Sequence, residues 1–101
     1  MEKNKFYDDG KRNLLYLGIT KDILEEKNIH KFIYYSQSSG EETMNKIEVP
    51  LGNIFEKDTK VIINWNNVFT SISRPNDIGD KFKELKEIYE NALERELELT
   101  K

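Results

Sequence analysis

The sequence predicts a single α+β domain, residues 1–101, with about six short, mostly antiparallel strands in an open sheet or a small closed barrel. A short helix near residues 21–28 and a long amphipathic helix near residues 78–99 should pack on the strands. Three observations support this fold class: short apolar runs separated by turn residues, an Asn-Asn pair between two β-rich runs, and a final stretch with helical periodicity. The chain is long enough for one modest core.

The first elements are strands. Residues 4–7 form a short one, and Asp8-Asp9-Gly10-Lys11 is a turn in which glycine supplies the positive φ. Residues 12–18 and 30–37 are apolar on both faces when read with a period of two. We therefore expect both of these strands to lie centrally in the sheet or beneath a helix.

The short helix is expected between those two strands. Thr20 is a good N-cap, and Asp22 lies in the first turn, where the helix dipole favours a carboxylate. The helix would run over residues 21–28 and turn Ile23 and Leu24 inward.

The next segment reads as a hairpin followed by an irregular stretch. Polar residues 36–42 form the hairpin loop, and the strand 43–49 returns with one apolar and one polar face before Pro50 ends it. In the stretch 51–59, Ile54 and Phe55 should hold the chain against the core.

Residues 61–72 predict a tight β-hairpin. Asn66 and Asn67 tolerate the positive φ that a two-residue turn requires. Pairing across this turn would set Trp65 opposite Val68, with Ile63 opposite Thr70 and Val61 opposite Ile72.

The last helix has the clearest periodicity in the chain. Asn76 or Asp77 can cap it, and Asp80 lies in its first turn. Eight apolar residues fall on one half of the helix and should lie across the sheet: Ile78, Phe82, Leu85, Ile88, Tyr89, Ala92, Leu93 and Leu97.

The composition excludes several classes of functional site. The chain has no cysteine, which excludes disulfides, thiolate metal sites and thiol nucleophiles. Its net charge is −3, with no basic or acidic tail. It has neither a signal peptide nor an apolar run of membrane-spanning length, so we expect a cytoplasmic protein without a membrane partner.

Catalytic motifs are sparse. The only histidine, His30, follows Glu26 by four residues, and we interpret it as an exposed or half-buried residue at a helix-to-strand junction. The neighbouring carboxylates are adjacent in sequence only, and the five glycines are isolated, so phosphate-loop and dinucleotide motifs are missing. We expect no enzyme, no cofactor and no metal.

The outer face of the last helix is the first candidate site. Glu87, Glu90, Glu94 and Glu98 lie within about 80° of one another, with Glu84 just beyond. Like charges at i,i+4 and glutamates near a helix C-terminus are both locally unfavourable, which points to an acidic surface for a basic protein partner. The predicted function is a small non-enzymatic binding protein, a regulator or inhibitor acting by macromolecular contact.

The alternative is an RNA-binding module. Trp65 and Tyr34 lie on predicted strands, with Lys60 and Arg74 at strand ends, and exposed aromatics with flanking cations bind single-stranded RNA. The count of six strands and two helices is compatible with small barrels that bind RNA, including the PUA type. A homodimer through the final helix or an unpaired edge strand is a further alternative.

Overall fold

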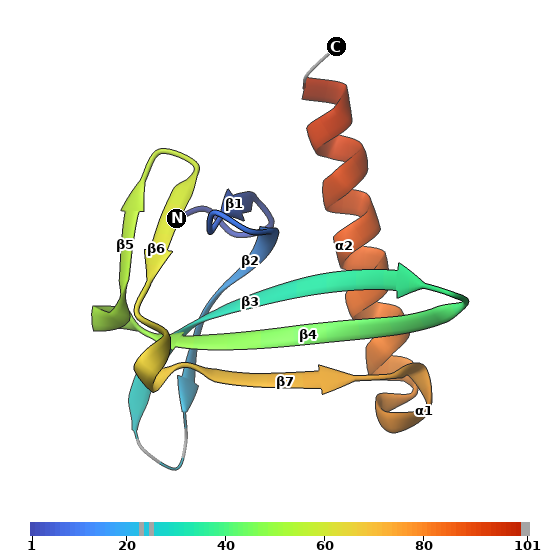
Figure 1. The fold of residues 1–101 in the computed structure, drawn as a ribbon, viewed down its shortest axis with the longest axis horizontal. Helices are drawn as coiled ribbons and strands as arrows, with labels where there is room; N and C mark the ends of the chain where they lie inside the picture. The colour runs from blue at the N-terminus through green and yellow to red at the C-terminus, as the bar shows by residue number, and fades with distance from the viewer. Residues whose placement is uncertain (23, 25, 100–101) are drawn as a thin grey trace.

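The computed structural model of the protein describes residues 1–22, 24 and 26–99 (Figure 1). Within this part, seven strands form one open mixed sheet in the order β5-β6-β1-β2-β3-β4-β7. The α+β class is confirmed, with more strands than the sequence indicated. All strand pairs are antiparallel except the parallel pair β1–β6. The strands are β1 (Phe6–Asp8), β2 (Asn13–Asp22), β3 (Lys27–Ser38), β4 (Glu41–Pro50), β5 (Ile54–Lys57), β6 (Lys60–Ile63) and β7 (Phe69–Ser73), and the helical elements are η1 (Leu51–Asn53), η2 (Trp65–Asn67), α1 (Pro75–Ile78) and α2 (Asp80–Leu99).

β2 and β3 are central and buried on both faces, as predicted. On β2, Leu14 points to one face and Leu15 to the other, and both are fully buried. On β3, Phe32 and Ile33 divide in the same way. The core therefore consists of two apolar clusters, one on each face of the sheet.

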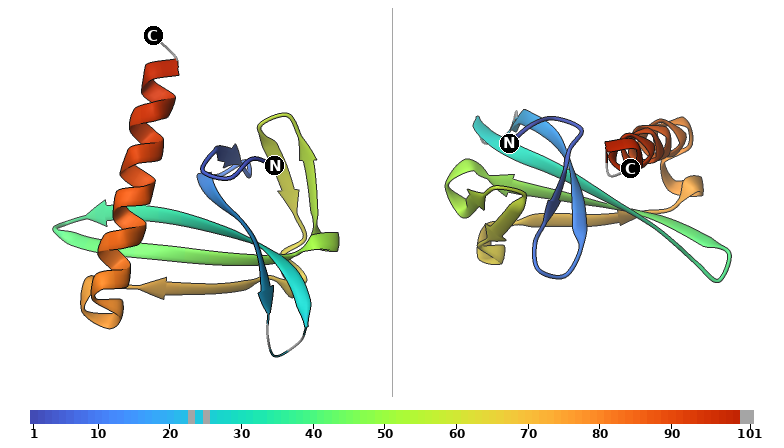
Figure 2. Two further views of the ribbon diagram at one scale, coloured as in Figure 1. Left: turned by 180° about the vertical axis from the view of Figure 1, so that it is seen from behind. Right: turned by 90° about the horizontal axis from the view of Figure 1, so that it is seen from above.

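The helix α2 covers the first cluster. Figure 2 shows α2 crossing the long β3–β4 pair on one side of the sheet. Phe82 and Leu85 are buried at this contact, and the ring of Tyr89 meets that of Phe6 edge to face at 5.3 Å between centroids. The buried residues of α2 extend from Phe82 to Ala92.

The β5–β6 hairpin covers the second cluster. After Pro50 ends β4, η1 turns the chain into β5, and β6 then pairs with β1 at the other side of the sheet. Val61 and Ile63 of β6 belong to the same cluster as Phe32 and Ile47. The sheet must therefore curl over its own face, although β5 and β7, each paired with a strand on one side only, form its two edges.

The predicted helix over residues 21–28 is wrong. β2 continues to Asp22 and β3 begins at Lys27, with Thr20 opposite Ile29 instead of capping a helix. Of this stretch, residues 23 and 25 lie outside the described residues. A helix of eight residues has few hydrogen bonds and needs packing to persist, whereas the hairpin pairs these backbones continuously. Glu26, directly before β3, has a positive φ of 55° in the connection between the two strands.

The predicted hairpin over residues 61–72 is also wrong. β6 pairs with β5 and β1, and β7 pairs with β4, so Ile72 lies opposite Asn45 and Thr70 opposite Ile47. The Asn-Asn pair lies in the 3₁₀ turn η2, in which the Asn64 side chain accepts a hydrogen bond from the Asn66 amide at 3.3 Å. The turn thus separates two strands that lie far apart in the sheet order.

The long helix is confirmed, with two corrections to the buried set. α1 and Gly79 precede α2, which begins at Asp80. Leu93 is 39% exposed and Leu97 64% exposed, because the last turns of α2 extend past the strands that bury the earlier turns (Figure 1). Phe55 is 63% exposed on the edge strand β5, so of the two residues predicted to hold this segment, Ile54 packs against the core and Phe55 does not.

Candidate binding surfaces

The outer face of α2 carries five exposed glutamates. Four are the predicted partner-binding residues, and the fifth is Glu84: Glu84, Glu87, Glu90, Glu94 and Glu98. Within the described part of the chain, none of the five forms an ion pair. We call these residues the acidic face.

Lys83 and Lys86 each lie four residues before a glutamate of the acidic face, and within the described residues neither forms an ion pair with it. The i,i+4 spacing suggests Lys86 as a partner of Glu90, but Lys86 Nζ donates to Glu42 Oε1 on β4 at 3.0 Å. This hydrogen bond raises the pKa of Lys86 above its ordinary value. The acidic face is thus less compensated in three dimensions than its sequence indicates.

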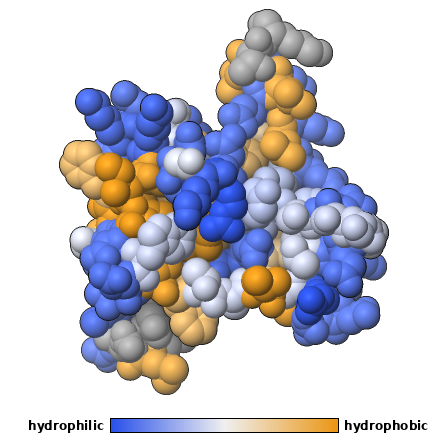
Figure 3. Space-filling view, in the orientation of Figure 1, coloured by the Kyte–Doolittle hydropathy of each residue, from blue (hydrophilic) through white to orange (hydrophobic). Residues whose placement is uncertain are grey.

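An apolar ridge borders the acidic face. Leu93 and Leu97 are one turn apart, and Glu90 and Glu94 follow the same spacing on the adjacent stripe of the helix. Figure 3 shows apolar side chains gathered over the distal end of α2, apart from a second apolar patch over β5 and β6. A carboxylate row beside exposed leucines can engage cations and apolar groups of one ligand together.

The alternative RNA-binding residues are spread over the molecule. Trp65 and Arg74 lie beyond opposite ends of β7, while Lys60 begins β6 next to the β5–β6 turn (Figure 1). The Arg12 guanidinium lies over the ring of Tyr34 on β3, 5.5 Å from the ring centroid. Trp65 is 45% exposed. The structure brings Tyr34 together with Arg12, and does not gather the four residues at one surface.

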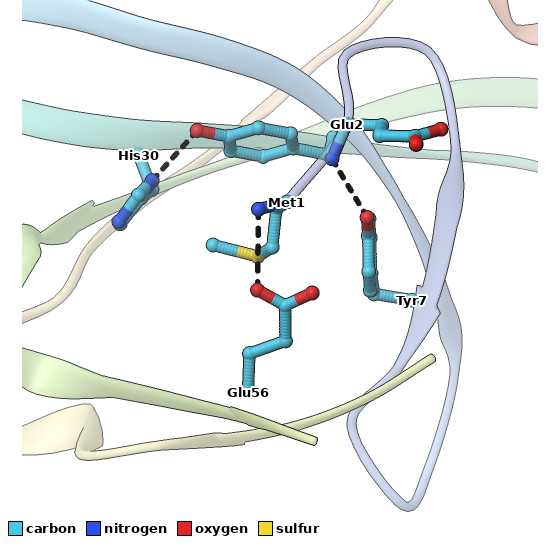
Figure 4. Close-up of polar contacts among 6 residues, drawn as sticks. Met1, Glu2, Tyr7, His30 and Glu56 are labelled. Carbon is cyan, nitrogen blue, oxygen red and sulfur yellow. Dashed lines mark hydrogen bonds and ion pairs between the residues drawn. The ribbon is translucent and has the colours of Figure 1, made fainter. Parts of the chain in front are cut away.

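His30 has a partner that sequence reasoning missed. Its Nδ1 lies 2.7 Å from the hydroxyl of Tyr16, on the neighbouring strand β2 (Figure 4). Burial, and secondarily the α-ammonium group of Met1, lower the pKa of His30. The neutral ring can therefore accept the Tyr16 hydroxyl hydrogen at Nδ1. Correct β2–β3 pairing is the signal that would have found this contact, since the two residues are fourteen positions apart.

Two further hydrogen-bonded groups lie near this pair. The Tyr7 hydroxyl accepts from the Glu2 amide at 2.7 Å, and Glu56 Oε2 is 3.2 Å from the Met1 ammonium (Figure 4). The rings of Tyr7 and Tyr16 pack edge to face, so these two hydrogen-bonded groups and the Tyr16–His30 pair form one layer over the second core cluster. We interpret this layer as a structural contact between the β5–β6 hairpin and the sheet.

Comparison with known proteins gives no relative. No family model, no curated protein and no solved structure matches the chain. Among residues 1–22, 24 and 26–99, no group of three or more His, Cys, Asp or Glu side chains is placed to hold a metal ion. In the same ranges, no helix is long and apolar enough to cross a membrane.

Proposed function

We propose that this protein is a small non-enzymatic binding module, a regulator or inhibitor, that captures a basic amphipathic segment of another protein on α2. One observation supports this most directly: the acidic face has no ion pair within the described chain and lies beside the exposed Leu93 and Leu97.

The chemistry of α2 favours a cationic partner. Glu90–Glu94 and Glu94–Glu98 are like-charge pairs at i,i+4, and Glu94 and Glu98 lie near the C-terminus, where the helix dipole is negative. Lysine or arginine side chains of a partner would relieve both effects. A second copy of the chain at this surface would instead set glutamates against glutamates.

The apolar ridge favours an amphipathic segment over a merely basic one. Leu93 and Leu97 lie on the side of the helix between the buried face and the acidic face. A helix with apolar residues at i and i+4, flanked by lysines, would bury this ridge and reach the glutamates at the same time.

Charge reversal on the acidic face provides the test. The probe is a fluorescein-labelled amphipathic helical peptide of leucine and lysine, and its affinity is measured by fluorescence anisotropy. Glu90→Lys combined with Glu94→Lys should weaken binding at least tenfold, whereas the matched control Glu26→Lys combined with Glu41→Lys, which makes the same charge change on exposed positions outside α2, should leave it within about twofold. Circular dichroism checks that each variant is folded.

Two further measurements separate this site from general attraction between opposite charges. A peptide of the same composition with its leucines scrambled should bind at least tenfold more weakly, and Leu97→Ser should weaken binding of the amphipathic peptide several-fold. Equal affinity for the scrambled peptide, or equal losses in the acidic-face and control variants, would refute capture by α2.

Exposed Trp65 keeps single-stranded RNA binding as a second candidate. If that function is correct, mixed-sequence RNA should quench Trp65 emission saturably and in a salt-sensitive way. Trp65→Ala should then weaken binding without changing its salt slope, whereas Lys60→Ala or Arg74→Ala should reduce the slope. A flat titration would leave peptide capture as the supported function.

A further inference from the structure

The face of the sheet that α2 covers extends beyond the helix. Residues opposite one another in antiparallel strands point to the same face, so the strand register defines successive rows across β3, β4 and β7. Met44 lies opposite Ser73 in the row packed by α2, and Lys46 lies between Ile33 and Ser71 in the next row.

The next two rows lie farther along the strands, away from α2. Glu48 lies opposite Lys31 on one side and Phe69 on the other. Ile29 and Pro50 then form the last row. Charged residues thus occupy the middle of this face and apolar residues its outer end.

Lys46 is crowded by cations in this arrangement. Its side chain is partly buried, and in the described part of the chain it has no ion pair or hydrogen bond. Burial lowers the pKa of Lys46, and so do the nearby charges of Lys31 and of Lys81 in the first turn of α2, while Glu48 alone acts in the opposite sense. Three nearby cations repel one another and Glu48 offsets this repulsion only in part, so a bound anion would stabilise this cluster.

An apolar groove begins where the charged rows end. It has a volume of about 490 Å³ and is lined by five apolar residues and two polar ones: Leu24, Ile29, Pro50, Val68 and Phe69, with Asn67 and Glu48. Phe69 is 67% exposed. Volumes of this order are typical of small-molecule sites.

We propose that this face binds a single-chain carboxylate of the fatty-acid type, with the carboxylate at Lys31, Lys46 and Lys81 and the chain in the groove. Lysines supply the charge complementarity, and the apolar lining supplies the contact with the chain. Glu48 borders both regions and repels a second negative charge, which favours a monoanionic head over a phosphate.

Decanoate, kept below its micelle concentration, is the probe. Trp65 reports the titration because it lies in η2, whose last residue, Asn67, lines the groove. Saturable binding should appear in Trp65 emission and in calorimetry. Decanol has the same chain without the charge and should bind at least tenfold more weakly, and vesicles of anionic phospholipid should not compete for the protein.

Lys46→Met is the decisive variant because it keeps the length of the side chain and removes its charge. It should weaken decanoate binding at least tenfold and raise the melting temperature of the unliganded protein, since the crowded cation is gone. Lys83→Met, at an exposed position on α2, is the matched control and should leave decanoate binding unchanged. A purely structural lysine would lower stability when replaced and leave the ligand affinity unaltered.

Other results would overturn the proposal. Decanol binding as tightly as decanoate would show that the lysines do not recognise the head. Unchanged affinity in both Lys46→Met and Lys31→Met, or preferential binding to vesicles, would remove the assignment to a free carboxylate. If binding is lost in Phe69→Ser but not in the lysine variants, the groove binds apolar groups without charge selection and the proposal fails.

Discussion

Lys86 Nζ on α2 donates to Glu42 Oε1 on β4 at 3.0 Å, which ties the helix to the β3–β4 hairpin across 44 positions of sequence. The Lys86 ammonium also lies over the Tyr35 ring, 5.5 Å from its centroid. The Lys86–Glu42 hydrogen bond thus has two consequences. It holds the buried side of α2 against the sheet, and it leaves Glu90 without the lysine at i,i+4.

Glu42→Gln should lower the pKa of Lys86 toward its ordinary value, because the hydrogen bond to Glu42 is the largest cause of its increase. Both side chains are partly exposed, so we expect only a small loss of stability. Titration of the lysine side-chain NMR signals measures the pKa, and Glu41→Gln, at the adjacent exposed position, is the control. An unchanged Lys86 pKa in Glu42→Gln would contradict the contact.

Leu85→Asp should destabilise the protein by about 3 to 5 kcal/mol, because it places a carboxylate without a partner under α2. Leu85 is only 4% exposed. Leu97→Asp, on the same helix at 64% exposure, should change the free energy of unfolding by less than about 1 kcal/mol. Urea unfolding followed by circular dichroism measures the free energy of unfolding of the two variants. Similar losses in both would show that the buried face of α2 is assigned incorrectly.

Gly18→Ala should cost about 1 to 3 kcal/mol because of backbone strain. Gly18 adopts φ 103° at the irregularity between β2 and β3, while a Cβ there would meet only the Lys3 side chain at 3.8 Å. Gly52→Ala is the matched control, since it has an ordinary φ and open space around it, and it should stay within about 0.5 kcal/mol of the parent. If both substitutions cost the same, the positive φ of Gly18 would not be the cause of the loss.

The sequence predicted the elements whose pattern is local and missed those decided by distant pairing. β2 and β3 were found because apolar residues on both faces of a strand indicate a central position. The interpretation of Asn66 and Asn67 was wrong because Asn tolerates positive φ without requiring it. Neither residue adopts a positive φ, whereas Asn4, Glu26, Ser39 and Asp58 do. The acidic face was readable from α2 alone, but the loss of Lys86 to Glu42 and the lysine rows depend on contacts that no local pattern encodes.

His30 should make the protein less stable in mild acid. Its pKa is lowered in the folded state, so below a pH of about 6.5 the unfolded chain binds more protons and the free energy of unfolding falls as the pH drops through the folded pKa. Protonation of Nδ1 would also remove the acceptor for the Tyr16 hydroxyl. In His30→Gln, which keeps an acceptor without a titrating ring, the decrease in stability from pH 7 to pH 5 should be shallower by a fraction of one proton. Urea midpoints measured across this range test it, and parallel curves for the two proteins would show that His30 titrates alike in the folded and unfolded states.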